Sequence, residues 1–75
     1  MLVKIKQLDG TVKDYTIDDP EKQTIAEFKE LISETTGVPS ESMKLIFNGR
    51  ILEDQTKIVE TPIKAGDTVT QIMNL

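Results

Sequence analysis

The sequence has no cysteine, histidine or tryptophan among its 75 residues, and its aromatic residues are one tyrosine and two phenylalanines. Without cysteine, the chain has no disulfide framework and no thiolate zinc site. Without histidine, it lacks the commonest general base and the commonest neutral metal ligand, so neither a Ser-His-Asp nor a Cys-His arrangement can form. We therefore expect a protein that is not an enzyme, that needs no cofactor, and whose core is built from aliphatic side chains.

Basic charge and long apolar runs are also scarce. The 13 acidic and 9 basic residues give a net charge of -4, which argues against nucleic acid as a partner, because that needs a concentrated basic surface. The apolar runs are only a few residues long, too short to span a membrane, and the first residues alternate instead of forming a secretory signal. We expect one small monomeric domain over residues 1–75, located in the cytosol or nucleus.

The first residues have the pattern of a β-hairpin. Met1, Val3 and Ile5 alternate with other residues, as in a half-buried strand. Leu8-Asp9-Gly10 is a turn signal, and residues 11–17 are predicted to form the returning strand. The polar stretch that follows carries several carboxylates without the ligand spacing of a calcium loop, so we interpret it as a solvated connection.

A helix is predicted over residues 25–35. The preceding Thr24 and the later Glu27 have the spacing of a capping box, in which both side chains accept hydrogen bonds from backbone amides at the helix start. Gly37 stands at a C-cap position, and Pro39 prevents continuation. Apolar residues recur at helical spacing and form one stripe, which we interpret as core: Ile25, Phe28, Leu31 and Ile32.

Residues 44–54 predict a strand, a tight turn and a second short strand. Leu45 and Phe47 share one parity, so a strand places both on one face, while Ile46 points the other way among polar residues. An apolar residue in such a position is a candidate contact point, but it can also lie under a loop or a second layer. Parity alone leaves both possibilities open.

The remaining elements complete a two-layer arrangement. Ile58 is expected to fill part of the core from a short helical turn, and residues 68–73 are expected to form the last strand. The order of strand, strand, helix, strand, short strand, strand describes an α+β roll, with one helix across one face of a mixed sheet. Because the helix covers one face, the other faces water, and we expect Ile46 and Ile72 on that open face.

Over essentially the whole chain, with a small insertion before Thr24, the sequence resembles ubiquitin and the ubiquitin-like domains. The segments that carry the resemblance are Met1 with Leu8-Asp9-Gly10, Thr24-Ile25, Gly37-Val38-Pro39, Lys44-Leu45-Ile46-Phe47-Asn48-Gly49-Arg50 and Leu52-Glu53-Asp54. The resemblance implies the β-grasp fold and a function in protein recognition without catalysis. The Met1 start and the Lys-Leu-Ile-Phe-x-Gly-Arg-x-Leu run look most like the N-terminal domains of shuttle factors that carry cargo to the proteasome.

The resemblance also implies a recognition patch drawn from three separate elements: Leu8, Ile46, Gly49, Thr70 and Ile72. Three basic residues would surround its apolar centre, namely Lys6, Lys44 and Arg50. A net acidic domain would then present a locally basic face that steers acidic partner helices toward the patch, with ordinary solvation as the alternative for each lysine. The implied partners are proteasome ubiquitin receptors, ubiquitin-interacting helices and ubiquitin-associated domains. In the same way, Lys29 on the helix is expected to reach Asp54.

The sequence departs from the family pattern in ways that bear on function. Conjugated members of the family end in Gly-Gly, whereas this sequence ends Ile72-Met73-Asn74-Leu75, and we expect no conjugation of the chain as written. Thr70 stands where a histidine is usual in the family. Arg50 replaces the lysine that ubiquitin uses for its best-known chain linkage, and a guanidinium cannot serve as the acyl acceptor for such a linkage. Lys13 and Gln71 take positions that are normally apolar, so we expect a looser core at the hairpin end, with the Lys13 stem packed and its amine in water.

These observations favour a non-conjugated ubiquitin-like domain in a longer, shuttle-type protein of protein degradation. It would dock on ubiquitin and proteasome receptors with roughly micromolar to millimolar affinity, because the patch is small. The alternative is a ubiquitin-like modifier whose Gly-Gly lies beyond Leu75, and the downstream coding sequence distinguishes the two. A catalytic site is disfavoured, because the serine and threonine hydroxyls have no histidine base.

Overall fold

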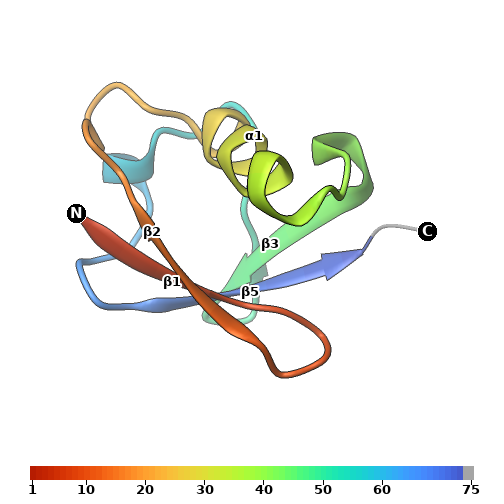
Figure 1. Cartoon of the computed structure of the whole chain (residues 1–75). Coiled ribbons are helices and arrows are strands. Elements are labelled where there is room, and N and C mark those ends of the chain that lie inside the picture. The colour runs from red at the N-terminus through yellow and green to blue at the C-terminus, as the bar shows by residue number, and fades with distance from the viewer. Residues whose placement is uncertain (74–75) are drawn as a thin grey trace.

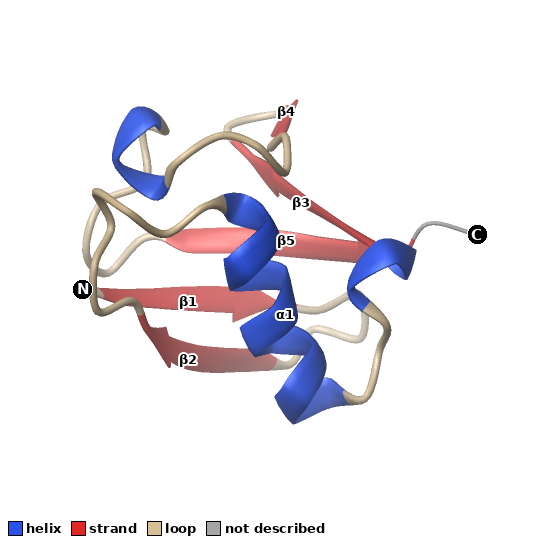
Figure 2. Ribbon diagram, turned by 90° about the horizontal axis from the view of Figure 1, so that it is seen from above, coloured by secondary structure: helices blue, strands red, loops and turns tan. Residues whose placement is uncertain are grey.

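Five strands form one mixed sheet, and one helix crosses a single face of it (Figures 1 and 2). The computed structural model describes residues 1–73, so two residues of the predicted 1–75 domain, Asn74 and Leu75, lie outside the described part. The elements are β1 (Leu2–Lys6), β2 (Val12–Thr16), α1 (Ile25–Thr36), the 3-10 turn η1 (Ser40–Ser42), β3 (Met43–Phe47), β4 (Arg50–Ile51), the 3-10 turn η2 (Ile58–Glu60) and β5 (Thr68–Met73). The predicted α+β roll is confirmed.

The strand order is β2-β1-β5-β3-β4. β1 and β5 pair in parallel, and the other three neighbouring pairs are antiparallel. Two strands from opposite ends of the described chain therefore lie side by side in the middle of the sheet (Figure 2). This pairing brings the turn after β1 close to the end of β5.

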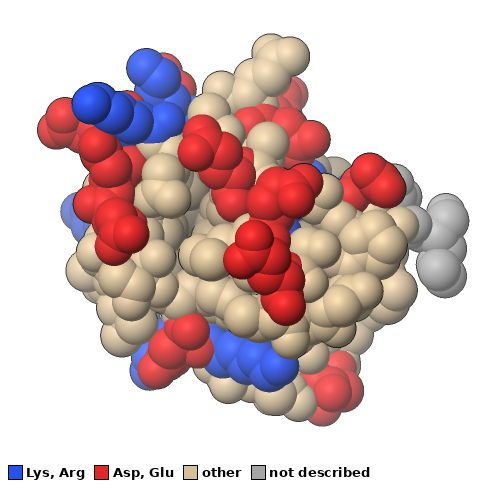
Figure 3. Space-filling model, turned by 45° about the horizontal axis from the view of Figure 1, so that its top comes forward, with Lys and Arg blue, Asp and Glu red and all other residues tan. Residues whose placement is uncertain are grey.

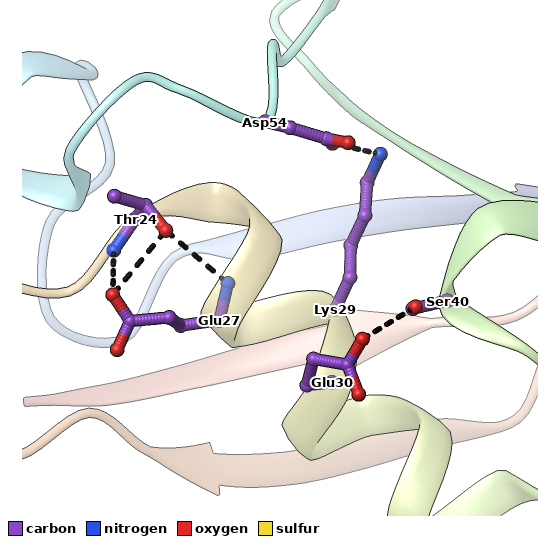
Figure 4. Close-up of polar contacts among 6 residues, drawn as sticks. All are labelled: Thr24, Glu27, Lys29, Glu30, Ser40 and Asp54. Carbon is purple, nitrogen blue, oxygen red and sulfur yellow. Dashed lines mark hydrogen bonds and ion pairs between the residues drawn. The ribbon is translucent and has the colours of Figure 1, made fainter.

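Local chemistry sets both ends of α1, which begins at Ile25 as predicted and ends at Thr36, one residue later than predicted. The Glu27 amide donates to Thr24 Oγ1 at 3.3 Å, and the Thr24 amide donates to Glu27 Oε1 at 3.4 Å, which forms the predicted capping box (Figure 4). Gly37 adopts a φ of 76°, and its amide donates to the Ser33 carbonyl at 2.9 Å. A left-handed residue here satisfies a free carbonyl of the last turn and ends the helix.

The core lies between α1 and the covered face of the sheet. Phe28 and Ile32 on the helix are buried against strand residues such as Val69, and Ile58 enters the core from η2 as predicted. The core consists of Val3, Ile5, Tyr15, Ile17, Ile25, Phe28, Ile32, Met43, Leu45, Leu52, Ile58, Ile63 and Val69. Most of its members are aliphatic, as the composition required.

The expected contact between Lys29 and Asp54 is present. Lys29 Nζ lies 2.5 Å from Asp54 Oδ1, and the Lys29 side chain is 9% exposed against 60% for Asp54 (Figure 4). The Ala26 amide donates to the Asp54 carbonyl at 3.1 Å, and the Ile25 amide donates to the Thr56 carbonyl at 2.9 Å. The first turn of α1 is therefore held to the loop after β4 by backbone and side-chain contacts together.

Two polar substitutions lie at the hairpin end of the sheet, and they differ in burial. Gln71 faces the helix side opposite Leu45 and is buried, and it lies beside a hollow of about 250 Å³. Lys13 lies opposite the buried Ile5, yet it is exposed. The lysine amine is therefore in water as expected, while the high exposure of the residue contradicts a packed stem. β2 is an edge strand, and among its residues only Tyr15 is buried, so little packs over the Lys13 end of it.

Candidate functional site

The open face of the sheet carries most of the predicted patch, because the strand register brings distant residues together. Ile46 on β3 pairs with Thr70 on β5, and Lys44 pairs with Ile72. Lys6 on β1 is the partner of Thr70 on the other side. Directly opposed residues point to the same face, so these residues share a surface that α1 does not cover.

The register extends this alignment across the whole sheet. One row runs through all five strands on the open face and consists of Val12, Lys6, Thr70, Ile46 and Ile51. We call it the cross-strand row. Val12 and Ile51 were not among the predicted site residues, although they are 48% and 55% exposed. The row therefore has exposed apolar side chains at both ends and a lysine within it.

Adjacent residues of β3 face opposite sides of the sheet as predicted, although Ile46 on the open face is only partly exposed. Leu45 is fully buried under α1, Phe47 packs partly against the core, and Ile46 faces away from both. Ile46 is half-buried, because β3 is an interior strand and the row neighbours Thr70 and Ile51 flank its side chain. It keeps an accessible surface, but other apolar residues of the open face are more exposed.

Leu8 is the most exposed large apolar residue of the described chain, at 70%. It lies in the turn between β1 and β2, where the Gln7 amide donates to the Thr11 carbonyl at 2.8 Å and the Gly10 amide donates to the Gln7 carbonyl at 3.0 Å. Because Leu8 is in a turn, strand register does not orient its side chain. It lines the same hollow as Gln71 and Met73, which places it beside the end of β5.

The turn between β3 and β4 determines which face the basic residue next to it occupies. Asn48 and Gly49 have φ values of 53° and 75°, which is the combination that a two-residue type I′ hairpin requires. This turn pairs Phe47 with Arg50 and Ile46 with Ile51. Arg50 therefore has the parity of the helix side, and its expected place around the apolar centre is taken by Ile51. Gly49 forms the rim of the surface at the turn.

Charge around the open face is mixed, with several basic groups. Lys6 is exposed and Lys44 is half-buried beside Ile72, while Lys4 lies opposite Asp14. The opposite side of the molecule differs, since acidic side chains are spread over the face that carries α1 (Figure 3). The domain thus combines a net negative charge with lysines on its open face.

One carboxyl near Leu8 has a perturbed pKa. The Thr11 amide donates to Asp9 Oδ1 at 2.9 Å, and this backbone hydrogen bond is the main cause that holds the pKa of Asp9 below its usual value. The Thr11 side chain acts in the same direction. Asp9 therefore contributes a negative charge at the tip of the first hairpin.

Within residues 1–73, no group of three or more histidine, cysteine, aspartate or glutamate side chains is arranged to hold a metal ion. In the same range, the helices are too short and too polar to cross a membrane.

The two row residues that sequence reasoning missed had detectable signals. Applying strand parity to Arg50 and Ile51, with a two-residue turn at Asn48-Gly49, places Ile51 opposite Ile46. Val12 could have been placed in the same way from the register of the first hairpin, which aligns it with Lys6. Neither residue belongs to the segments that carry the resemblance, so no motif pointed to them.

Comparison with known proteins agrees with this architecture. A family model described as the ubiquitin family matches residues 3–75. The chain is 32% identical over 68 residues to ubiquilin from Dictyostelium discoideum, covering 91% of this chain and 13% of that protein. It is 30% identical over 70 residues to the ubiquitin domain-containing protein DSK2a from Arabidopsis thaliana, covering 93% of this chain and 13% of that protein. It is also 32% identical over 75 residues to the ubiquitin-like protein NEDD8 from D. discoideum, covering all of this chain and 95% of that protein.

Proposed function

The chain belongs to the ubiquitin family, and from this premise we propose that it is a non-catalytic protein-interaction domain that docks through its open sheet face. The surface would consist of the predicted patch, Leu8, Ile46, Gly49, Thr70 and Ile72, extended by the cross-strand row to Val12 and Ile51. Its partners would be ubiquitin and proteasome receptors that present helices or ubiquitin-associated domains.

The observation that carries the proposal is the alignment of apolar side chains on a face that the helix leaves uncovered. Ile46 and Ile51 are direct cross-strand partners, and Ile72 lies two pairs further along β3 and β5, which is the next position on the same face. When the residues of a strand alternate between the core and the solvent, the solvent-facing side of the sheet is ordinarily polar. Exposed apolar groups gathered on one face are typical of protein-binding surfaces.

The lysines on this face supply electrostatic selectivity. Lys6 stands within the cross-strand row, and Lys44 stands opposite Ile72. An acidic partner helix would be attracted to this side of the domain and repelled by the acidic side that carries α1. We expect the association rate to fall as salt is added, since these lysines are accessible to ions.

Two kinds of host protein are compatible with the domain, and we favour the first. The chain spans only 13% of the ubiquilin and DSK2a relatives, so in proteins of that kind it would be one domain of a longer, shuttle-type protein that acts in degradation in the cytosol or nucleus. The alternative is a ubiquitin-like modifier, because the chain spans 95% of the NEDD8 relative. The coding sequence downstream of Leu75 distinguishes them: further domains support the first, and a Gly-Gly soon after Leu75 supports the second.

The docking proposal is tested by titrating the domain with an acidic ubiquitin-interacting helix and with a proteasome ubiquitin receptor, using NMR and calorimetry. Ile46→Ala is expected to weaken binding by about 2 kcal/mol, as for a central anchor. The matched control is Val59→Ala, because Val59 is a β-branched apolar residue that is 55% exposed but lies on η2, away from the open face. Similar losses for the two variants, or chemical shift changes confined to the α1 side, would refute docking through the open face.

A further inference from the structure

Gln71 is a polar residue in a position that the fold itself does not explain. It lies on β5, opposite Leu45 on the helix side of the sheet, and is only 4% exposed. Its Oε1 is buried and has no hydrogen-bond partner among the described residues. Leaving an amide oxygen unpaired in the interior destabilises a protein by about 1–3 kcal/mol. A partner atom from outside the domain would remove this penalty.

Gln71 lines a hollow that is open to solvent at the hairpin end of the sheet. The hollow has a volume of about 250 Å³, and we call it the hairpin-end pocket. Its apolar walls come from three elements that meet here: Leu8 in the first turn, Val38 after α1 and Met73 at the end of β5. The remaining walls are polar and include Gln7, Asp9 and Thr36.

The polar groups of the pocket have more acceptor capacity than donor capacity. The Thr36 hydroxyl donates its proton to the Ile32 carbonyl at 2.9 Å and accepts from the Val38 amide at 3.3 Å. Asp9 offers only acceptors while it is ionised, and hydrogen bonds from Thr11, chiefly from its amide to Oδ1, satisfy them in part. The buried Oε1 of Gln71 is also an acceptor, while the side-chain amide groups of Gln7 and Gln71 each carry donors as well. A ligand that brings donors fits this inventory.

The electrostatic environment of the pocket favours a positive ligand. The pocket lies at the C-terminal end of α1, where the helix dipole is negative and the last turn has no basic residue. Asp9 adds a negative charge on the rim, which the nearby Lys13 offsets in part. The acidic side chains spread over the α1 face add to the same potential (Figure 3).

We propose that the hairpin-end pocket receives a lysine or arginine side chain of a partner protein. The methylene stem would lie along Leu8, Val38 and Met73. The Gln71 amide would rotate to present its Oε1, which is buried in the free domain, to the cationic group, and that group would also donate toward the Asp9 carboxylate. The pocket shares Leu8 with the open-face surface but lies on the helix side of the sheet. The inference therefore stands or falls separately from docking at Ile46.

The test is an NMR titration of the folded domain with N-acetyl-arginine amide, and with N-acetyl-citrulline amide as a neutral probe of similar shape, at constant ionic strength. The arginine probe is expected to shift the Gln71 side-chain amide and the Val38 and Met73 methyl signals, with an affinity at least threefold above that of the citrulline probe. Equal affinities, or no shifts at these groups, would overturn the proposal.

Variants separate the acceptor, the charge and the open face. Gln71→Leu keeps a side chain of similar size but removes the acceptor, and Asp9→Asn removes the charge while retaining an oxygen for the Thr11 amide. Each is expected to weaken the arginine probe at least threefold, whereas Ile46→Ala should leave its affinity unchanged. Wild-type affinity in both pocket variants would overturn the proposal. Loss of affinity in Ile46→Ala would instead place the probe on the open face and also overturn it.

Discussion

Leu45 and Ile46 are consecutive residues of β3 that face opposite sides of the sheet, so truncating each to alanine should have different consequences. Leu45 is fully buried beneath α1, and Leu45→Ala would leave a cavity in the core. Such truncations lower the free energy of unfolding by about 2–5 kcal/mol. Ile46 lies on the open face, where truncation opens no enclosed cavity and removes contacts with Thr70 and Ile51. Cross-strand contacts of this kind are worth roughly 0.2–1 kcal/mol each, so Ile46→Ala should destabilise the fold by about 1 kcal/mol.

These magnitudes are measurable in a domain of this size. A change of 1 kcal/mol shifts the melting temperature of a small domain by about 4–8 °C, so Ile46→Ala should melt a few degrees lower and Leu45→Ala at least about 10 °C lower. Thermal melts and denaturant titrations would be recorded beside binding to an acidic ubiquitin-interacting helix. We expect Leu45→Ala to retain binding at temperatures where it is folded, while Ile46→Ala loses it.

Two outcomes would refute this reasoning. Equal destabilisation by the two variants would mean that β3 does not place Leu45 and Ile46 on opposite faces with unequal burial. If folded Leu45→Ala lost as much binding as Ile46→Ala, binding would not depend specifically on the side chains of the open face. The first outcome would contradict the strand register, and the second would contradict docking through the open face.

Three further predictions concern other parts of the molecule. Lys29→Met keeps the apolar stem but removes the ion pair with Asp54, which is 60% exposed, and it should lower the free energy of unfolding by less than about 1 kcal/mol. Lys29→Ala also removes the stem and should lower the free energy of unfolding by about 2 kcal/mol. Equal values for the two variants in denaturant titrations would contradict a packing role for the stem. Gln71→Leu should raise the free energy of unfolding by about 1 kcal/mol, because it removes a buried unpaired oxygen, and a clear loss of stability would show that this oxygen is satisfied in solution. The Asp9 carboxyl should titrate by carbon NMR below its ordinary value of 3.8, because the Thr11 amide stabilises the ionised form. The contribution of this hydrogen bond to the stability of the fold is then present above the pKa of Asp9 in the unfolded chain, and it is lost as the pH falls through the lower pKa of Asp9 in the folded domain. Thr11→Pro, which lacks the amide proton, should return the pKa of Asp9 toward 3.8.

Much of the architecture follows from short-range patterns. The capping residues Thr24 and Glu27 and the left-handed Gly37 are local signals, and they placed the ends of α1 to within one residue. Strand parity placed Leu45 in the core and Ile46 on the other face. Each of these features depends on hydrogen bonds or side-chain directions within a few residues, which is why the sequence alone sufficed.

The candidate site was predicted less completely. The motif suggested that Arg50 borders the apolar centre, but the type I′ turn at Asn48-Gly49 gives it the opposite parity and brings Ile51 beside Ile46. Val12 was missed because its place depends on how the first hairpin aligns with Lys6. These positions depend on register between strands, and a shift of one residue moves every side chain of a strand to the other face.

The amino-acid sequence by itself indicated the fold class and the expected role of the protein. The lack of histidine and cysteine disfavoured a catalytic site, the resemblance to ubiquitin-like domains implied protein recognition, and the apolar periodicities predicted one helix against a mixed sheet. Only the tertiary structure decided which residues meet, because β1, β3 and β5 are far apart in sequence and become neighbours solely through pairing. The cross-strand row and the pocket beside Gln71 both arise from that pairing, since each combines side chains whose proximity no local pattern encodes.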